Sequence, residues 1–254
     1  MIAETIGVGL VVGMVLGLTG AGGSIFAVPL YIVLLGLPIN DAMGMSLGAV
    51  SAAALTGVLL RNRSRDLAWR PGLLLAVSGM PAAPVGRWLG AQIDAKLLLS
   101  GFALLAISLA VRMWQQAGRH RYAPVANALP ANGSSSGALL LAGAAAGLLS
   151  GLFGVGGGFL IVPLLTLHLG MEARSAVGTS LVVIALVSAA GFAFHLLAVA
   201  DVPLQTLGYS SLGAVTGIVA GTLLARGISG PRLQKLFAIS VVGMMAATLA
   251  KTQI

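Results

Sequence analysis

The sequence predicts an all-α polytopic membrane protein made of two inverted repeats, each a glycine-tipped helical hairpin followed by three longer transmembrane helices. The first observation is composition: of 254 residues, 58% are hydrophobic and only 8% are charged, with a mean hydropathy of +1.03. Soluble domains are about 25% charged. The second is the recurrence of apolar runs long enough to cross about 30 Å of hydrocarbon. The third is a glycine-rich stretch that occurs twice.

The two glycine-rich stretches occupy residues 17–30 and 151–164, and Pro29 matches Pro163 at an offset of 134 positions. The same offset pairs Gly20/Gly154, Gly22/Gly156, Gly23/Gly157, Gly36/Gly170, Ala42/Ala176, Gly44/Gly178, Ser46/Ser180 and Gly57/Gly191. So many matches at one offset indicate a tandem duplication. We expect repeat one at 1–118, a cytoplasmic linker at 119–137 and repeat two at 138–254, all within one integral membrane domain.

Each repeat offers two short apolar segments around its glycines and three longer ones after them. In repeat one the predicted helices are Ile6–Leu18, Ile25–Leu37, 41–60, 71–89 and 96–114. In repeat two they are 138–150, 159–170, 173–197, 203–225 and 231–250. Asn40-Asp41, Asp94 and Gly230-Pro231 stand where helix caps or first turns belong.

The segments beside the glycines are about 13 residues long, or about 20 Å as helix, which predicts that neither crosses the membrane alone. Two alternatives remain: one broken, tilted crossing, or a hairpin that enters and leaves on the same side. The hairpin arrangement places 11 of the 14 Lys and Arg on one face, against 8 for the single crossing, and the positive-inside rule favours the larger imbalance. It also inverts the second repeat and leaves the N-terminus outside.

Glycines at these tips suit a binding site, because irregular backbone at membrane depth survives where it is buried in protein or lines a watery cavity. At each tip a half-helix begins, near Ser24 and Gly158, and its first N–H groups and positive dipole end favour an anion. Discontinuous helices at matching places in two halves point to a transporter site. The predicted substrate-binding residues are Gly20, Gly22, Gly23, Ser24, Ser46, Gly154, Gly156, Gly157, Gly158, Thr179 and Ser180.

Other glycines have a simpler role. Gly9, Gly13 and Gly17, and their equivalents Gly143, Gly147 and Gly151, are spaced by four, which predicts close helix–helix packing. No Lys-Ser/Thr pair follows the tips, so a phosphate loop is not indicated.

The remaining polar residues leave alternatives open. Gly44-Met45-Ser46-Leu47-Gly48 matches the G-x-S-x-G pattern of a nucleophilic serine. Its repeat, residues 178–182, keeps the serine but loses the second glycine, which favours a paired binding role over catalysis. Arg87 and His195 are possible accessory residues, although an arginine at a helix end commonly snorkels to the surface. The simpler interpretation of His168 and His195 is a structural role. We expect no cofactor and no metal.

The number and placement of the charged residues limit the kinds of partner that the protein is expected to bind. The formal net charge is +8, yet no basic stretch alternates with aromatics, so nucleic-acid binding is not expected. The partners expected are a small anion and the lipid bilayer; the oligomeric state is left open. All six acidic residues fall at helix ends or in loops, so coupling through a buried carboxylate is not indicated.

Repeat two contains the stretch Gly154-Val155-Gly156-Gly157-Gly158-Phe159-Leu160-Ile161-Val162-Pro163, followed by Ala176-Val177-Gly178-Thr179-Ser180. These two stretches resemble the motifs of the sulfite exporter TauE/SafE family of bacterial membrane proteins. Repeat one departs from the pattern at Ser24 and Met45. The resemblance implies a multi-pass inner-membrane transporter, not an enzyme, that exports a small sulfur-containing anion such as sulfite or an organosulfonate. An anion channel, an intramembrane hydrolase using Ser46 and His195, and a non-transporting scaffold are the alternatives.

Overall fold

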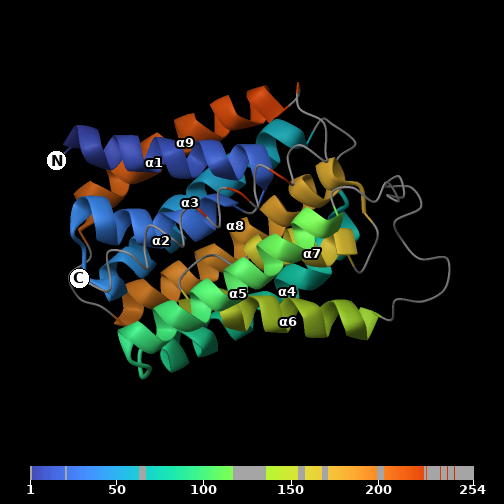
Figure 1. Cartoon of the computed structure of the whole chain (residues 1–254), viewed down its shortest axis with the longest axis horizontal. Coiled ribbons are helices and arrows are strands. Elements are labelled where there is room, and N and C mark those ends of the chain that lie inside the picture. Colours follow the sequence, from blue (N-terminus) through green and yellow to red (C-terminus); the bar gives the residue numbers. More distant parts are fainter. Residues whose placement is uncertain are drawn as a thin grey trace.

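A computed structural model of the chain describes residues 2–20, 22–62, 67–116, 136–153, 158–167, 171–198 and 203–225, together with Gly227, Lys235, Ile239 and Gly243. All regular elements in this part of the chain are helices, which confirms the predicted all-α class (Figure 1). They are α1 (Ile2–Thr19), α2 (Gly22–Leu35), α3 (Ile39–Arg61), α4 (Trp69–Gly90), α5 (Ala95–Gln116), α6 (Ser136–Phe153), α7 (Gly158–Leu167), α8 (Ala173–Ala198) and α9 (Leu204–Ala225). The helix expected at 231–250 lies almost entirely outside the described residues.

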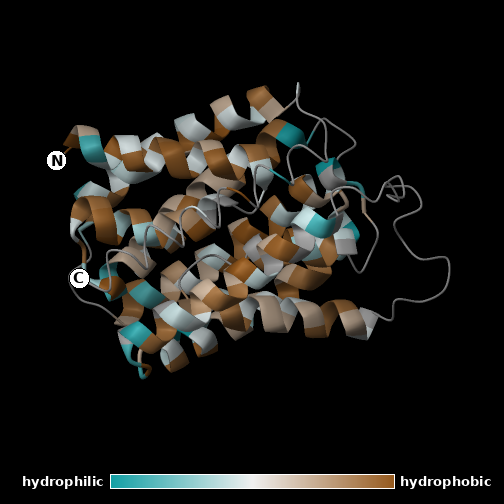
Figure 2. Ribbon diagram, viewed as in Figure 1, coloured by the Kyte–Doolittle hydropathy of each residue, from teal (hydrophilic) through white to brown (hydrophobic). Residues whose placement is uncertain are grey.

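The helices repeat as the sequence does. α6, α7, α8 and α9 begin within two residues of the positions 134 after the starts of α1, α2, α3 and α4. Within the described residues, four helices are long and apolar enough to cross a membrane: α1, α3, α8 from Arg174, and α9. Figure 2 shows hydrophobic residues along the helices and hydrophilic ones mainly toward the two ends of the bundle.

The first tip is a tight helical hairpin. Gly20 ends α1 with φ of +68°, and its N–H donates to the Leu16 carbonyl at 2.7 Å. Gly23, in the first turn of α2, lies so close to Val12 and Leu16 that a Cβ there would overlap both. α2 therefore folds back along α1.

The expected length of the first segment is wrong. α1 begins at Ile2 rather than Ile6 and has 18 residues, which gives a helix of about 27 Å. Glu4 lies in its first turn, where a carboxylate favours the positive end of the helix dipole. α1 is therefore long enough to cross the membrane alone.

Two glycine faces join the repeats. Gly9, Gly13 and Gly17 of α1 press on the backbone of α9, and a Cβ at Gly13 would overlap the Ala214 carbonyl. The equivalent glycines of α6, Gly143, Gly147 and Gly151, press in the same way on α4. The close packing predicted for these glycines is confirmed, and the first helix of each repeat packs against the fourth helix of the other.

The centre of the bundle is formed by α3 and α8, which are equivalent helices. Gly44 lies against His195, and Gly57 lies against Leu181, so the two helices run antiparallel. Midway between these contacts, the Ser51 hydroxyl donates to the Ala185 carbonyl at 3.0 Å.

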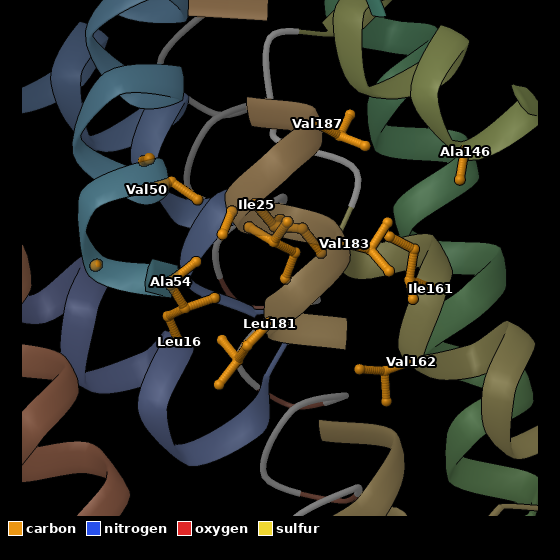
Figure 3. Close-up of a cluster of buried hydrophobic side chains, with 14 of the residues drawn as sticks. Leu16, Ile25, Val50, Ala54, Ala146, Ile161, Val162, Leu181, Val183 and Val187 are labelled. Atoms are coloured by element: carbon orange, nitrogen blue, oxygen red, sulfur yellow. The ribbon is translucent and has the colours of Figure 1, made fainter. Parts of the chain in front are cut away.

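The apolar core surrounds this crossing. Figure 3 shows Val50 and Ala54 of α3 and Leu181 and Val183 of α8 among buried side chains from the neighbouring helices. α3 and α8 therefore form the centre of the described bundle, and the first tip lies against α8.

Candidate functional site

The first glycine tip is held by the opposite repeat. Ser180, in the second turn of α8, donates its hydroxyl to the Gly20 carbonyl at 2.8 Å and to the Val177 carbonyl at 2.8 Å. A Cβ at Gly20 would lie 2.7 Å from the Val177 Cα. Only glycine therefore fits between the end of α1 and the start of α8.

Two further polar groups surround this tip. The buried Thr179 hydroxyl accepts a hydrogen bond from the Ala68 N–H, at the start of α4, at 3.0 Å. Arg61, in the last turn of α3, donates from Nη2 to the Gly17 carbonyl at 2.9 Å. The tip of repeat one therefore lies among hydroxyls from repeat two and an arginine from repeat one.

The other predicted tip residues are placed only in part. Gly22 is the first residue of α2 and Gly158 the first residue of α7, so both half-helices begin where expected. Ser24 lies in the first turn of α2. Gly154, Gly156 and Gly157 lie outside the described residues, as does His168.

Ser46 does not join the first tip. It lies five residues before Ser51 on α3, whereas Ser180 lies five residues before Ala185 on the antiparallel α8. At 1.5 Å per residue, the two serines are about 15 Å apart along the bundle. The Ser46 side chain is fully buried, and its Oγ has no hydrogen-bond partner in the described part of the chain.

The accessory residues, Arg87 and His195, form a second polar group at the other end of α3 and α8. Arg87, in the last turn of α4, is only 6% exposed. It donates from Nη1 and Nη2 to the Asn40 Oδ1 at 3.4 and 3.3 Å. The expectation that this arginine snorkels to the surface is wrong, because α3 supplies partners that hold it inside.

His195 completes this group. It lies in the last turn of α8 and is 2% exposed. Its imidazole covers Gly44, where a Cβ would overlap the ring. Its Nδ1 has no hydrogen-bond partner among the described residues, and it interacts electrostatically with Arg87.

The candidates thus divide into two groups, one at each end of the central helix pair. One end holds Gly20, Thr179 and Ser180, and the other end holds Arg87 and His195. Ser46 lies on α3 between Asn40 and the point where Ser51 contacts α8. Sequence reasoning missed Arg61. The repeat offset could have found it, because 134 positions separate Arg61 from His195.

Ser46 and His195 do not form a hydrogen-bonded pair of nucleophile and base in the described chain. A hydrolase would need Ser46 to hydrogen-bond a base, yet neither the Ser46 Oγ nor the His195 Nδ1 has a hydrogen-bond partner in the described chain. Over the same residues, no group of three or more His, Cys, Asp or Glu could hold a metal ion. What the two groups do offer is hydroxyl, guanidinium and backbone N–H donors, which suit an anion.

Comparisons with known proteins agree with a membrane transporter. The family model described as sulfite exporter TauE/SafE matches residues 5–248. The chain is 33% identical to a probable membrane transporter protein of Xylella fastidiosa over 247 residues, covering 94% of this chain and 92% of that protein. It is 31% identical to the probable membrane transporter protein YdhB of Bacillus subtilis over 180 residues, covering 68% of this chain and 69% of that protein.

A more distant relative is the probable membrane transporter protein MJ0441 of Methanocaldococcus jannaschii, at 26% identity over 211 residues, covering 81% of this chain and 76% of that protein. No solved structure matches the fold significantly. The family match covers nearly all of both repeats, including the first tip and the Arg87 group. The chain therefore belongs to the sulfite exporter TauE/SafE family of membrane transporters.

Proposed function

We propose that this chain exports a small sulfur-containing anion, such as sulfite or an organosulfonate, across the bacterial inner membrane by alternating access. The observation that carries the proposal is the hydrogen bond from Ser180 to the Gly20 carbonyl at 2.8 Å. It joins the tip of one repeat to a helix of the other. Any movement between the repeats must therefore open or close this tip.

The chemistry around the first tip supports an anionic substrate. The first N–H groups of α2, at Gly22 and Gly23, have no acceptor within their own helix, and the positive end of the helix dipole adds about 0.3–2 kcal/mol for a negative charge. The Thr179 hydroxyl accepts from Ala68 and can still donate its own hydrogen to a ligand. Arg61 brings a positive charge next to Gly17.

The antiparallel arrangement of α3 and α8 supports the transport mechanism. α3 and α8 are equivalent in sequence and run antiparallel, as they would if repeat two were inverted relative to repeat one. Inverted repeats with broken helices allow one half to rock against the other around a bound substrate. With the N-terminus outside, the first tip faces the cytoplasm, and the Arg87 group faces the exterior.

The direction follows from charge. An inside-negative membrane potential drives an anion outward by about 2.3 kcal/mol per charge per 100 mV. Export of an anion then needs no coupling ion. The family description, which names sulfite, supports the sulfur oxyanion as the substrate class.

The test is flux in proteoliposomes under an imposed potential, using sulfite, methanesulfonate, sulfate and chloride as substrates. We expect saturable flux of sulfite or methanesulfonate in the direction set by the potential, and its loss in Gly20→Ala. Absence of flux for all four anions under both polarities would end the proposal. Flux that rises linearly with concentration would favour an anion channel instead.

A further inference from the structure

Arg87 is a buried cation whose hydrogen bonds in the described chain all go to neutral groups. Its guanidinium is 6% exposed, and its hydrogen bonds go to the Asn40 amide oxygen at 3.3 and 3.4 Å and to the Met43 sulfur at 3.7 Å. These partners are neutral. Across the residues that the structure describes, Arg87 forms no ion pair with a carboxylate.

Such a charge is costly, because buried charges in proteins are normally paired. Charged side chains inside membrane proteins are rare and usually mark a substrate or ion pathway. The Asn40 bonds are also long, near the upper limit for an N–H···O bond. Asn40 therefore orients the guanidinium without neutralising it.

His195 adds a second incomplete group beside the first. Its side chain is 2% exposed and its Nδ1 has no hydrogen-bond partner in the described chain. Glycine at position 44 is what allows the imidazole to lie against α3, since a Cβ would overlap the ring. A residue with a side chain there would expel His195 from its place near Arg87.

We infer that Arg87, His195 and Asn40 form a second anion-binding site, selective for compact oxyanions of single charge, at the opposite end of α3 and α8 from Gly20. The inference rests on the proposed function, in which an exported anion must pass both ends of the bundle. Arg87 provides the charge, Asn40 fixes its plane, and His195 contributes a donor or acceptor at Nδ1.

The charge balance points to a monoanion. Asp41 attracts Arg87 and His195 electrostatically but forms no ion pair with Arg87 among the described residues, so it offsets the arginine's charge only in part. A sulfonate or hydrogen sulfite adds one negative charge, whereas sulfate adds two to the same buried place. A sulfonate also presents two oxygens to the guanidinium, which is the geometry that arginine binds best.

The experiment uses the purified full-length protein in detergent and isothermal titration with methanesulfonate, sulfate and chloride. Asn40→Asp places a carboxylate where the amide oxygen now lies and gives Arg87 a permanent internal anion. We expect it to weaken methanesulfonate binding by about 10- to 100-fold, the effect of losing a charge-assisted hydrogen bond. We also expect a higher melting temperature for this variant than for wild type in anion-free buffer.

Arg87→Met should abolish methanesulfonate binding. Arg70→Gln is the matched control, because it removes an exposed arginine from the opposite end of the same helix, and it should bind as wild type does. If Arg87→Met does not fold, Asn40→Asp remains the deciding variant. Unchanged affinity in Asn40→Asp, equal affinity for sulfate and methanesulfonate, or no saturable binding to wild type would each overturn the inference.

This test can fail separately from the proposed function. Arg87-dependent binding without flux in proteoliposomes would retain the site and remove the transport proposal. Flux that survives unchanged in Arg87→Met and Asn40→Asp would retain transport and remove the site.

Discussion

Ser51 and Ala185 are equivalent residues of the two repeats, and the Ser51 hydroxyl donates to the Ala185 carbonyl at 3.0 Å across 134 positions. A residue that touches its own counterpart lies next to the axis that relates the two copies. The hydrogen bond therefore marks the centre of the bundle, and features on either side of it occur in pairs: Arg61 with His195, and Ser46 with Ser180.

Ser51→Ala should lower stability modestly and leave substrate selectivity unchanged. It removes one hydrogen bond between the repeats, worth about 1 kcal/mol, and creates little empty space. Thermal unfolding in detergent measures the first effect and competition between anions in a flux assay measures the second. A change in selectivity would place Ser51 in the substrate path.

Gly13→Ala should destabilise the protein by about 1–3 kcal/mol, the usual cost of overpacking. The new Cβ would overlap the Ala214 carbonyl and push α1 away from α9. Gly7→Ala is the control on the same helix, since nothing lies within 4 Å of the added Cβ. It should be neutral or more stable by up to about 1 kcal/mol, because alanine favours a helix. Equal melting temperatures for the two variants would contradict the proposed packing of α1.

Gly20→Ala should reduce both stability and flux, whereas Gly36→Ala should reduce stability alone. Both glycines have left-handed backbones, with φ of +68° and +64°, and alanine costs about 1–2 kcal/mol there. A Cβ at Gly20 also meets the Val177 Cα at 2.7 Å, while one at Gly36 meets nothing within 4 Å. Flux per folded protein, compared between the two variants, separates the tip's function from backbone strain. Equal flux in both would argue against a role for the tip.

Ser180→Ala and Ser46→Ala should behave differently although the residues are equivalent. Ser180→Ala removes the hydroxyl donor from the Gly20 carbonyl and should cost about 1–3 kcal/mol, because a buried acceptor loses its partner. Ser46→Ala removes a buried hydroxyl that has no partner in the described chain, so it should be neutral or stabilising. If Ser46 binds substrate, Ser46→Ala will raise the KM for flux without lowering the melting temperature. A large loss of stability in Ser46→Ala would show a structural role instead.

Helix positions and the duplication could be predicted from the sequence because their signals are local. The lengths of the apolar runs, the glycines between them and the fixed offset locate α2 to α9 within a few residues. Asp94 caps α5 as expected, because its carboxylate accepts a hydrogen bond from the Lys96 N–H at 2.8 Å. The predicted segment Ile6–Leu18 is shorter than α1 because Glu4 and Thr5 lie outside the continuous apolar run. Both are polar, but a first turn tolerates polar residues.

The contacts between residues far apart in the sequence could not be predicted, because an offset shows which residues are equivalent and not which residues touch. Gly20 meets Ser180 across 160 positions. Arg87 looked like a surface residue because it is near a helix end, and its burial depends on Asn40, 47 positions away. No periodic pattern in a single sequence encodes such pairs.

The exchanged glycine faces set an order for biosynthesis. α1 is synthesised before the other described helices, and its partner, α9, begins 185 residues after α1 ends. At 5–20 residues per second, roughly 10–40 s separate the two. During this interval the Gly9, Gly13 and Gly17 face has no α9 to pack against. α4 and α6, which are close in sequence, can associate much earlier, so the two exchanged faces pair at different times during synthesis.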